Sequence, residues 1–181
     1  MERHANYALV GLTSTVLIIG LIMFSLWLSA FKFGQAYDQY DIAFISGGWG
    51  AAYDLAQSPV LAAKVSESYY GDKAAMIGGV CHGVLGLVNA RDRDGELLIA
   101  GRRMTGVTDK QIKELGIELT PLHPETELRK AGAVFESQTA FRDMLATHVV
   151  ADDEQRFVTG QNQNSGLEAA HTMMRILSER D

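Results

Sequence analysis

The hydrophobic positions of this chain follow two different patterns. Residues 7–30 form one uncharged, largely apolar run of 24 residues, whereas later apolar positions come in short runs separated by polar turns. A helix of that length rises about 36 Å at ~1.5 Å per residue, enough to cross a hydrocarbon core of roughly 30 Å. We therefore expect residues 1–30 to be a single transmembrane anchor and residues 31–40 to be a linker.

A cleaved signal peptide is the alternative for this N-terminal run, because Leu28-Ser29-Ala30 ends in a small residue. The run is longer than the apolar core of a signal peptide, which is about 7–15 residues, and this favours an anchor. Arg3 and Lys32 flank the two ends, so the positive charges leave the orientation open. The prediction is a single-pass membrane protein, with the side on which its main domain lies left open.

Residues 41–181 alternate between patterns typical of strands and patterns typical of helices. Short apolar runs that end at turns predict strands at residues 41–46, 73–80, 97–101, 133–135, 147–150 and 156–159. Helical spacing and capping residues predict helices within residues 51–70, after Val84, after Asp109, at 125–131 and at 167–179. Such alternation predicts an α/β fold with a layered, mostly parallel sheet and ligands at the carboxyl ends of its strands.

The composition argues against several kinds of partner. The chain carries a net charge of −6, and it shows no basic face of the kind that nucleic acid requires. Its single cysteine rules out an internal disulfide, and its histidines are scattered over separate segments. No Cys/His spacing matches a zinc site. We therefore expect neither a nucleic-acid partner nor a bound metal.

The single cysteine, Cys81, follows the predicted strand that ends at Val80 and precedes the apolar start of a helix at Val84. Such a strand–turn–helix corner lifts a nucleophile clear of the sheet and points backbone N–H groups at it. The positive end of a helix also lowers a thiol pKa, and the thiolate is the reactive form. The alternative is a buried cysteine that acts as a small hydrophobic residue.

Four segments of residues 41–181 resemble the DJ-1/PfpI (ThiJ) superfamily, which has the class I glutamine-amidotransferase-like, flavodoxin-like fold. They are residues 45–50 (ISGGWG), 79–83 (GVCHG), 103–109 (RMTGVTD) and 158–162 (VTGQN). The resemblance implies that Cys81 is a nucleophile that needs no cofactor, and that the backbone N–H groups of Gly48 and His82 form an oxyanion site. It also implies a triad in which His82 accepts the thiol proton and Asp109 holds the imidazolium.

Two of these assignments have local alternatives. For His82 the alternative is a backbone-only role, because adjacent residues on a turn often point apart. For Asp109 it is a helix N-cap, a position that suits an aspartate.

The chain also departs from the family pattern. The strand–helix–strand unit that normally precedes the segment equivalent to residues 41–46 is missing, and with it a glutamate that hydrogen-bonds the cysteine. We therefore expect an N-terminally truncated domain in which residues 41–46 form an open sheet edge. Either a second copy covers this edge in a homo-oligomer, or the domain is only marginally stable. Residues 1–42 resemble the membrane-anchor start of MCE/MlaD-type proteins.

The leading hypothesis is a cysteine enzyme that resembles glyoxalase III or the protein deglycases and acts on small reactive dicarbonyls or their protein adducts. The alternative is a catalytically weak, membrane-tethered stress or interaction protein of the same family, which the missing glutamate and strands favour. A recombined reading frame without a folded product is a third hypothesis. Amidotransferase activity is not expected, because the chain shows no synthase domain. Lipid transport is not expected either, because only the anchor resembles the lipid transporters.

Overall fold

The computed structural model describes residues 13–25, 41–140, 142 and 146–180. The chain divides into two units, residues 1–38 and 39–181. In the first unit, residues 13–25 are helical and their side chains are exposed. Among the described residues, no helix combines the length and the apolar character that a membrane crossing requires. The predicted anchor extends at both ends into residues outside the described ranges, and the predicted linker, residues 31–40, lies outside them entirely.

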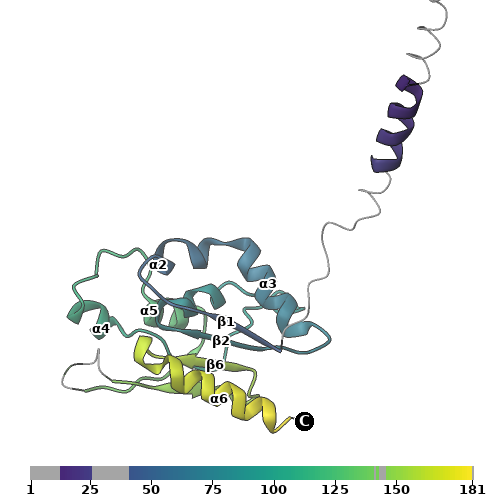
Figure 1. The fold of residues 1–181 in the computed structure, drawn as a ribbon. Coiled ribbons are helices and arrows are strands. Elements are labelled where there is room, and N and C mark those ends of the chain that lie inside the picture. The colour runs from purple at the N-terminus through teal and green to yellow at the C-terminus, as the bar shows by residue number, and fades with distance from the viewer. Residues whose placement is uncertain (1–12, 26–40, 141, 143–145, 181) are drawn as a thin grey trace, which may run out of the picture. The chain divides into compact units, whose positions relative to one another are not determined.

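The second unit is built on a four-stranded sheet with the order β1-β2-β6-β5 (Figure 1). β1 (Ile42–Ile45), β2 (Met76–Val80) and β6 (Phe157–Gly160) are parallel, whereas β5 (Val149–Ala151) runs antiparallel to β6. A second, two-stranded parallel sheet joins β3 (Arg103–Met104) to β4 (Val134–Phe135). The prediction of an α/β fold with a mostly parallel sheet is confirmed.

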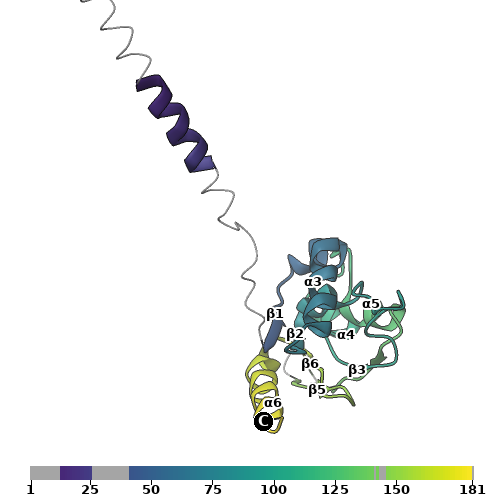
Figure 2. The same cartoon turned by 90° about the vertical axis from the view of Figure 1, so that its right-hand side faces the viewer.

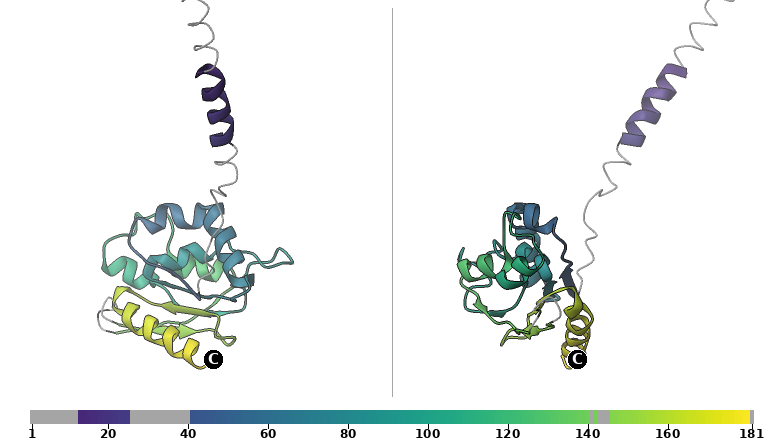
Figure 3. Two further views of the ribbon diagram at one scale, coloured as in Figure 1. Left: turned by 45° about the vertical axis from the view of Figure 1, so that its right-hand side comes forward. Right: turned by 90° about the vertical axis from the view of Figure 1, so that its left-hand side faces the viewer.

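Helices cover both faces of the four-stranded sheet. The helices are α2 (Ala51–Asp54), α3 (Pro59–Tyr70), α4 (Asp109–Glu114), α5 (Pro124–Lys130) and α6 (Gly166–Ser178). α6 lies on one face, and α2, α3 and α5 lie on the other (Figures 2 and 3). α3 begins as its sequence predicts, because the Ser58 side chain accepts a hydrogen bond from the Leu61 N–H at 3.2 Å and Pro59 opens the helix.

The core has two layers that meet at β2, whose five residues are all buried. Ile77 points into the layer formed with α2, α3 and α5, whereas Met76 points into the layer formed with α6. On α6, the buried residues Ala169, Met173 and Ile176 recur at helical spacing and form the face that meets the sheet. Burial on both faces explains why β2 is a continuous apolar run rather than an alternating one.

Two sequence-based assignments need correction. Residues 97–101, predicted to be a strand, form successive turns, in which the Leu97 carbonyl accepts from the Ala100 N–H and the Ile99 carbonyl from the Arg102 N–H. This run is apolar because Leu98 and Ile99 are buried in the core, and burial does not require a strand. The predicted helix at Val84 is a buried 3-10 helix, Cys81–Leu87.

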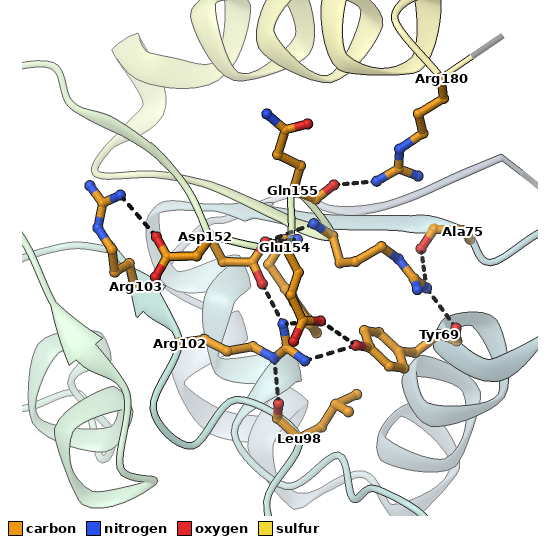
Figure 4. Close-up of polar contacts among 12 residues, drawn as sticks. Tyr69, Ala75, Leu98, Arg102, Arg103, Asp152, Glu154, Gln155 and Arg180 are labelled. Atoms are coloured by element: carbon orange, nitrogen blue, oxygen red, sulfur yellow. Dashed lines mark hydrogen bonds and ion pairs between the residues drawn. The ribbon is translucent and has the colours of Figure 1, made fainter.

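A buried polar network ties α3 to the hairpin between β5 and β6, at the amino ends of the parallel strands (Figure 4). Arg102 donates to the carboxylate of Asp152 at 2.5 Å and to the hydroxyl of Tyr69 at 2.8 Å. Asp152 is almost fully buried, and it also accepts the backbone N–H groups of Arg156 and Phe157. The network thereby fixes the start of β6, whose other end lies beside Cys81.

Candidate active site

Cys81 lies at the carboxyl end of β2, on a sharp turn. Its backbone has a φ of +61°, a left-handed conformation that residues with a side chain rarely adopt. Two glycine contacts make the turn possible. A Cβ on Gly47 would lie 2.6 Å from both the Cys81 Cβ and the Val80 carbonyl oxygen, and a Cβ on Gly83 would collide with the backbone of Ile45. The loop after β1 therefore packs directly against the cysteine, and the sharp turn predicted after the strand is present.

Burial and nearby backbone groups act in opposite directions on the Cys81 thiol. Burial raises the pKa of the Cys81 thiol, while hydrogen bonds from the backbone of His82, Gly48 and Gln163 act in the opposite direction and lower it. Gly48 and His82 are the two residues whose N–H groups were expected at an oxyanion site. Both favour a negative charge on the Cys81 sulfur, and their role toward a bound oxygen stays a prediction.

Gln163 is a donor that the sequence reasoning missed. It begins the 3-10 helix Gln163–Ser165, which Asn162 caps by accepting the Asn164 N–H at 3.0 Å. The sequence interpretation assigned no donor to the polar loop between β6 and α6. The only signal for the donor was that a helix start leaves free N–H groups, which favour a nearby anion.

His82 is fully buried, and its Nδ1 lies 3.5 Å from the Cys81 sulfur. Burial, reinforced by the charge that His123 can carry, lowers the pKa of His82 to about 4. The imidazole is therefore neutral at pH 7, and Nδ1 can accept the thiol proton in the tautomer that carries hydrogen on Nε2. Within the described part of the chain, Nε2 has no hydrogen-bond partner. His82 thus contributes its side chain as well as its backbone.

Asp109, the third member of the predicted triad, does not meet His82. Its carboxylate accepts a hydrogen bond from the Thr126 hydroxyl at 3.0 Å and lies 3.9 Å from Nδ1 of His123. No hydrogen bond or ion pair connects Asp109 with Cys81 or His82 among the described residues. Asp109 is not the N-cap of α4 either, because Thr108 occupies that position and forms a capping box with Gln111.

The remaining surroundings of Cys81 are apolar. Val107, Ile112 and Ile117 pack with it in a small hydrophobic cluster. In the ranges that the structure describes, no three metal-binding side chains come together. The chemistry that this arrangement offers is a thiol, a neutral imidazole and backbone groups that favour the thiolate, and no carboxylate of the described residues bonds to either side chain.

Comparisons with known proteins give structural matches only. No protein-family model matches the sequence, and no curated protein is similar to it. The expected resemblance of residues 1–42 to MCE/MlaD-type proteins therefore has no support.

Solved structures of longer proteins are similar to this one. Rapid Encystment Protein 24 kDa of Francisella tularensis is 28% identical with a TM-score of 0.67, over 75% of this chain and 57% of that one. Glyoxalase III from Candida albicans is 30% identical with a TM-score of 0.63, over 75% of this chain and 56% of that one. A ThiJ/PfpI domain protein from Brachyspira murdochii, 16% identical with a TM-score of 0.56 over 80% and 65% of the two chains, shares the fold.

The chain thus spans less than two thirds of the length of each of these proteins. In this chain the fold is a mostly parallel α/β sheet with a cysteine on a strained corner after a central strand. The structural neighbours of this chain include a glyoxalase III and a ThiJ/PfpI domain protein, and the chain shares their fold.

Proposed function

We propose that the protein is a cofactor-independent cysteine enzyme that acts on small reactive dicarbonyl compounds or on their protein adducts. The observation that carries the proposal is the pairing of the Cys81 sulfur with Nδ1 of a neutral His82 at 3.5 Å, and the backbone of Gly48 and Gln163 favours the thiolate. The similarity to a glyoxalase III at 30% identity supports the choice of substrate class.

The reaction begins with an addition to the aldehyde. His82 takes the thiol proton at Nδ1, and the Cys81 sulfur attacks the aldehyde carbon of methylglyoxal. The carbonyl oxygen becomes negatively charged and is held by the backbone N–H groups of Gly48 and His82 until it is protonated. The product of this step is a hemithioacetal on Cys81.

The second half is an internal redox step that needs no outside oxidant. A base removes the hydrogen from the carbon attached to sulfur, an enediol forms, and a proton returns to the neighbouring carbon. The former aldehyde carbon is thereby oxidised to a thioester, and the former ketone carbon is reduced to an alcohol. Water then displaces the sulfur, so that methylglyoxal and one water yield lactate and the free thiol. His82 is the base that this site offers for the proton transfers.

The test is lactate release from methylglyoxal by the full chain. We expect Cys81→Ala to abolish it and His82→Gln to lower it by at least tenfold, because a general base contributes about 10²–10⁴ to rate. Met174→Ala, on the exposed surface of α6, is the matched control and keeps the wild-type rate. Lactate release by Cys81→Ala at the wild-type rate would contradict the proposal.

A second function, a catalytically weak and membrane-tethered stress or interaction protein, rests on two observations of its own. Burial raises the pKa of the Cys81 thiol, and Asp109 does not reach His82 to hold an imidazolium. The uncharged run of 24 residues would supply the tether. Under this function, the iodoacetamide alkylation rate of Cys81 rises only above the usual thiol pKa, and lactate release stays near the uncatalysed rate. Membrane extraction with alkaline carbonate tests the tether.

A further inference from the structure

In the described part of the chain, no strand pairs with the outer edge of β1. β1 is the first strand of the sheet, and β2 is its only strand neighbour among the described residues (Figure 2). The Asp41 carbonyl accepts from the Met76 N–H at 2.9 Å, so the backbone groups of Ala43 and Ile45 also point toward β2. Those of Ile42 and Phe44 alternate with them and point outward. They form a row of donors and acceptors with which no described strand pairs.

Nothing in the sequence of this edge protects it from pairing. Exposed edge strands of monomeric proteins usually carry a lysine, a proline or a bulge that blocks another strand. Residues 41–46 (DIAFIS) contain no lysine or proline, and β1 pairs with β2 in regular register. The one charged side chain, Asp41, lies 3.7 Å from Lys73 and is neutralised by it.

The edge also exposes an aromatic side chain. The Phe44 ring lies over Gly78, where a Cβ would come within 2.7 Å of the ring. Its other side faces outward, and 39% of the residue is exposed. Ile42 lies on the same face of the strand, because alternate residues share a face. The open edge therefore combines unpaired backbone with an aromatic surface that is already fixed in place.

We propose that β1 pairs antiparallel with β1 of a second copy of this chain, with Phe44 directly opposite Phe44 of that copy. A two-fold axis perpendicular to the sheet makes an edge strand complementary to itself. This axis leaves the α6-covered faces of the two sheets on the same side of the joint sheet. Two β1 residues that lie opposite each other must therefore both point to that face or both point away from it. A centre at Phe44 meets this condition and places the two aromatic rings against each other, a favourable cross-strand pair.

The register follows from the backbone groups and the charges. With the centre at Phe44, Ile42 lies opposite Ser46, so all outward-pointing groups of these three residues find partners. A centre at Ala43 would instead set the Asp41 carboxylate opposite the apolar Ile45. With Phe44 at the centre, the two Asp41 residues lie six positions apart, about 20 Å at ~3.4 Å per residue. No like charges oppose each other at the joint.

This pairing has a consequence for Cys81. β1 continues into the loop of Gly47 and Gly48, which packs against the cysteine and supplies one of its donors. A strand held on both sides fixes the position of that loop better than an edge strand does. The second copy therefore stabilises a part of the site without entering it.

Site-directed cross-linking in the full chain, solubilised in mild detergent, tests both the pairing and its register. In a Cys81→Ser background, Phe44→Cys should be converted to a covalent dimer by a short bis-maleimide. Ile42→Cys and Ser46→Cys are the matched controls. Each is displaced by two residues from the axis, so the two copies lie about 14 Å apart at ~3.4 Å per residue and should not cross-link. A mixture of the Ile42→Cys and Ser46→Cys chains should cross-link, because those positions are opposite each other.

The set of positions that cross-link distinguishes this dimer from one formed through the apolar N-terminal run. Cross-linking in that other dimer would not depend on the position of the cysteine within β1. A second measurement is sedimentation velocity of the wild type and of Phe44→Lys, which should raise the dimer dissociation constant at least tenfold. Leu119→Lys, at a residue that is 97% exposed, should leave it unchanged. Circular dichroism confirms that the variants are folded. Equal cross-linking at all three positions, none at position 44, or a monomeric wild type would overturn the proposal.

Discussion

Gly47→Ala is the substitution that tests most closely how the site is packed. The new Cβ would lie 2.6 Å from the Cys81 Cβ and from the Val80 carbonyl oxygen, and 3.1 Å from the backbone nitrogen of His82. These atoms belong to the backbone or lie next to it, so no flexible side chain can move away to make room. Overpacking of this kind costs about 1–3 kcal/mol of folding free energy.

The strain is relieved only if the loop after β1 moves away from Cys81. The backbone of Gly48 then withdraws from the sulfur, and the site loses one of its donors. The loss of one such donor costs about 10²–10³ in kcat. For a domain of this size, 1–3 kcal/mol corresponds to a fall in melting temperature of roughly 2–12 °C. We therefore expect Gly47→Ala to lower both stability and lactate release.

Thermal unfolding followed by circular dichroism, together with the methylglyoxal assay, measures both effects. Gly50→Ala is the matched control in the same loop, because a Cβ there meets nothing within 4 Å and the backbone is already helical, with a φ of −57°. The control should melt and react like the wild type. A Gly47→Ala protein with the wild-type melting temperature and rate would refute the close packing of this loop on Cys81.

Three further outcomes are expected. Asp152→Ala leaves Arg102 with the more exposed Glu154 as its carboxylate partner and removes the acceptor of two backbone N–H groups, so it should lower the free energy of unfolding by about 1–3 kcal/mol in urea denaturation; a loss below about 1 kcal/mol would contradict a structural role for Asp152. The lowered pKa of His82, about 4, means that the unfolded chain binds more protons between pH 6.5 and 4, so stability should fall as the pH drops through that window. This slope should become shallower in His82→Gln, and an unchanged slope would argue against a buried neutral imidazole. Asp109→Asn should lower lactate release by less than tenfold, because Asp109 contacts Thr126 and His123 rather than His82; a loss above about 100-fold would restore the triad.

The parts of the fold that the sequence predicted well are those with a strong local signal. β2 is a short apolar run that ends at a glycine-rich corner, and α3 begins with Ser58 and Pro59, which cap a helix by known local contacts. Residues 97–101 were misassigned because an apolar run indicates burial, not the backbone conformation that achieves it. The antiparallel direction of β5 depends on pairing between distant segments, which local patterns do not encode.

In the candidate site, too, the sequence predicted the residues that are set by local structure and missed those that are placed by distant packing. Cys81 and His82 are adjacent in the sequence, so the strained corner determines their relationship, and the structure places Nδ1 beside the sulfur. Gln163 acts through its backbone, a group that every residue except proline carries, and no residue type marks such a donor. The position of Asp109 depends on how α4 packs against α5. The Thr126 hydroxyl donates a hydrogen bond to its carboxylate there, and His123 lies beside it.

The central claim, that Cys81 is the nucleophile of a dicarbonyl-converting enzyme, is tested most directly by exchanging one atom. Cys81→Ser replaces sulfur with oxygen, a much weaker nucleophile near neutral pH, and keeps the side chain otherwise intact. The measurement is lactate formed from methylglyoxal at pH 7 by the wild-type and substituted full chains. We expect the wild type to form lactate above the uncatalysed rate and the serine variant to lose at least 100-fold of that activity. Equal rates for the two proteins, or no lactate from the wild type, would contradict the account.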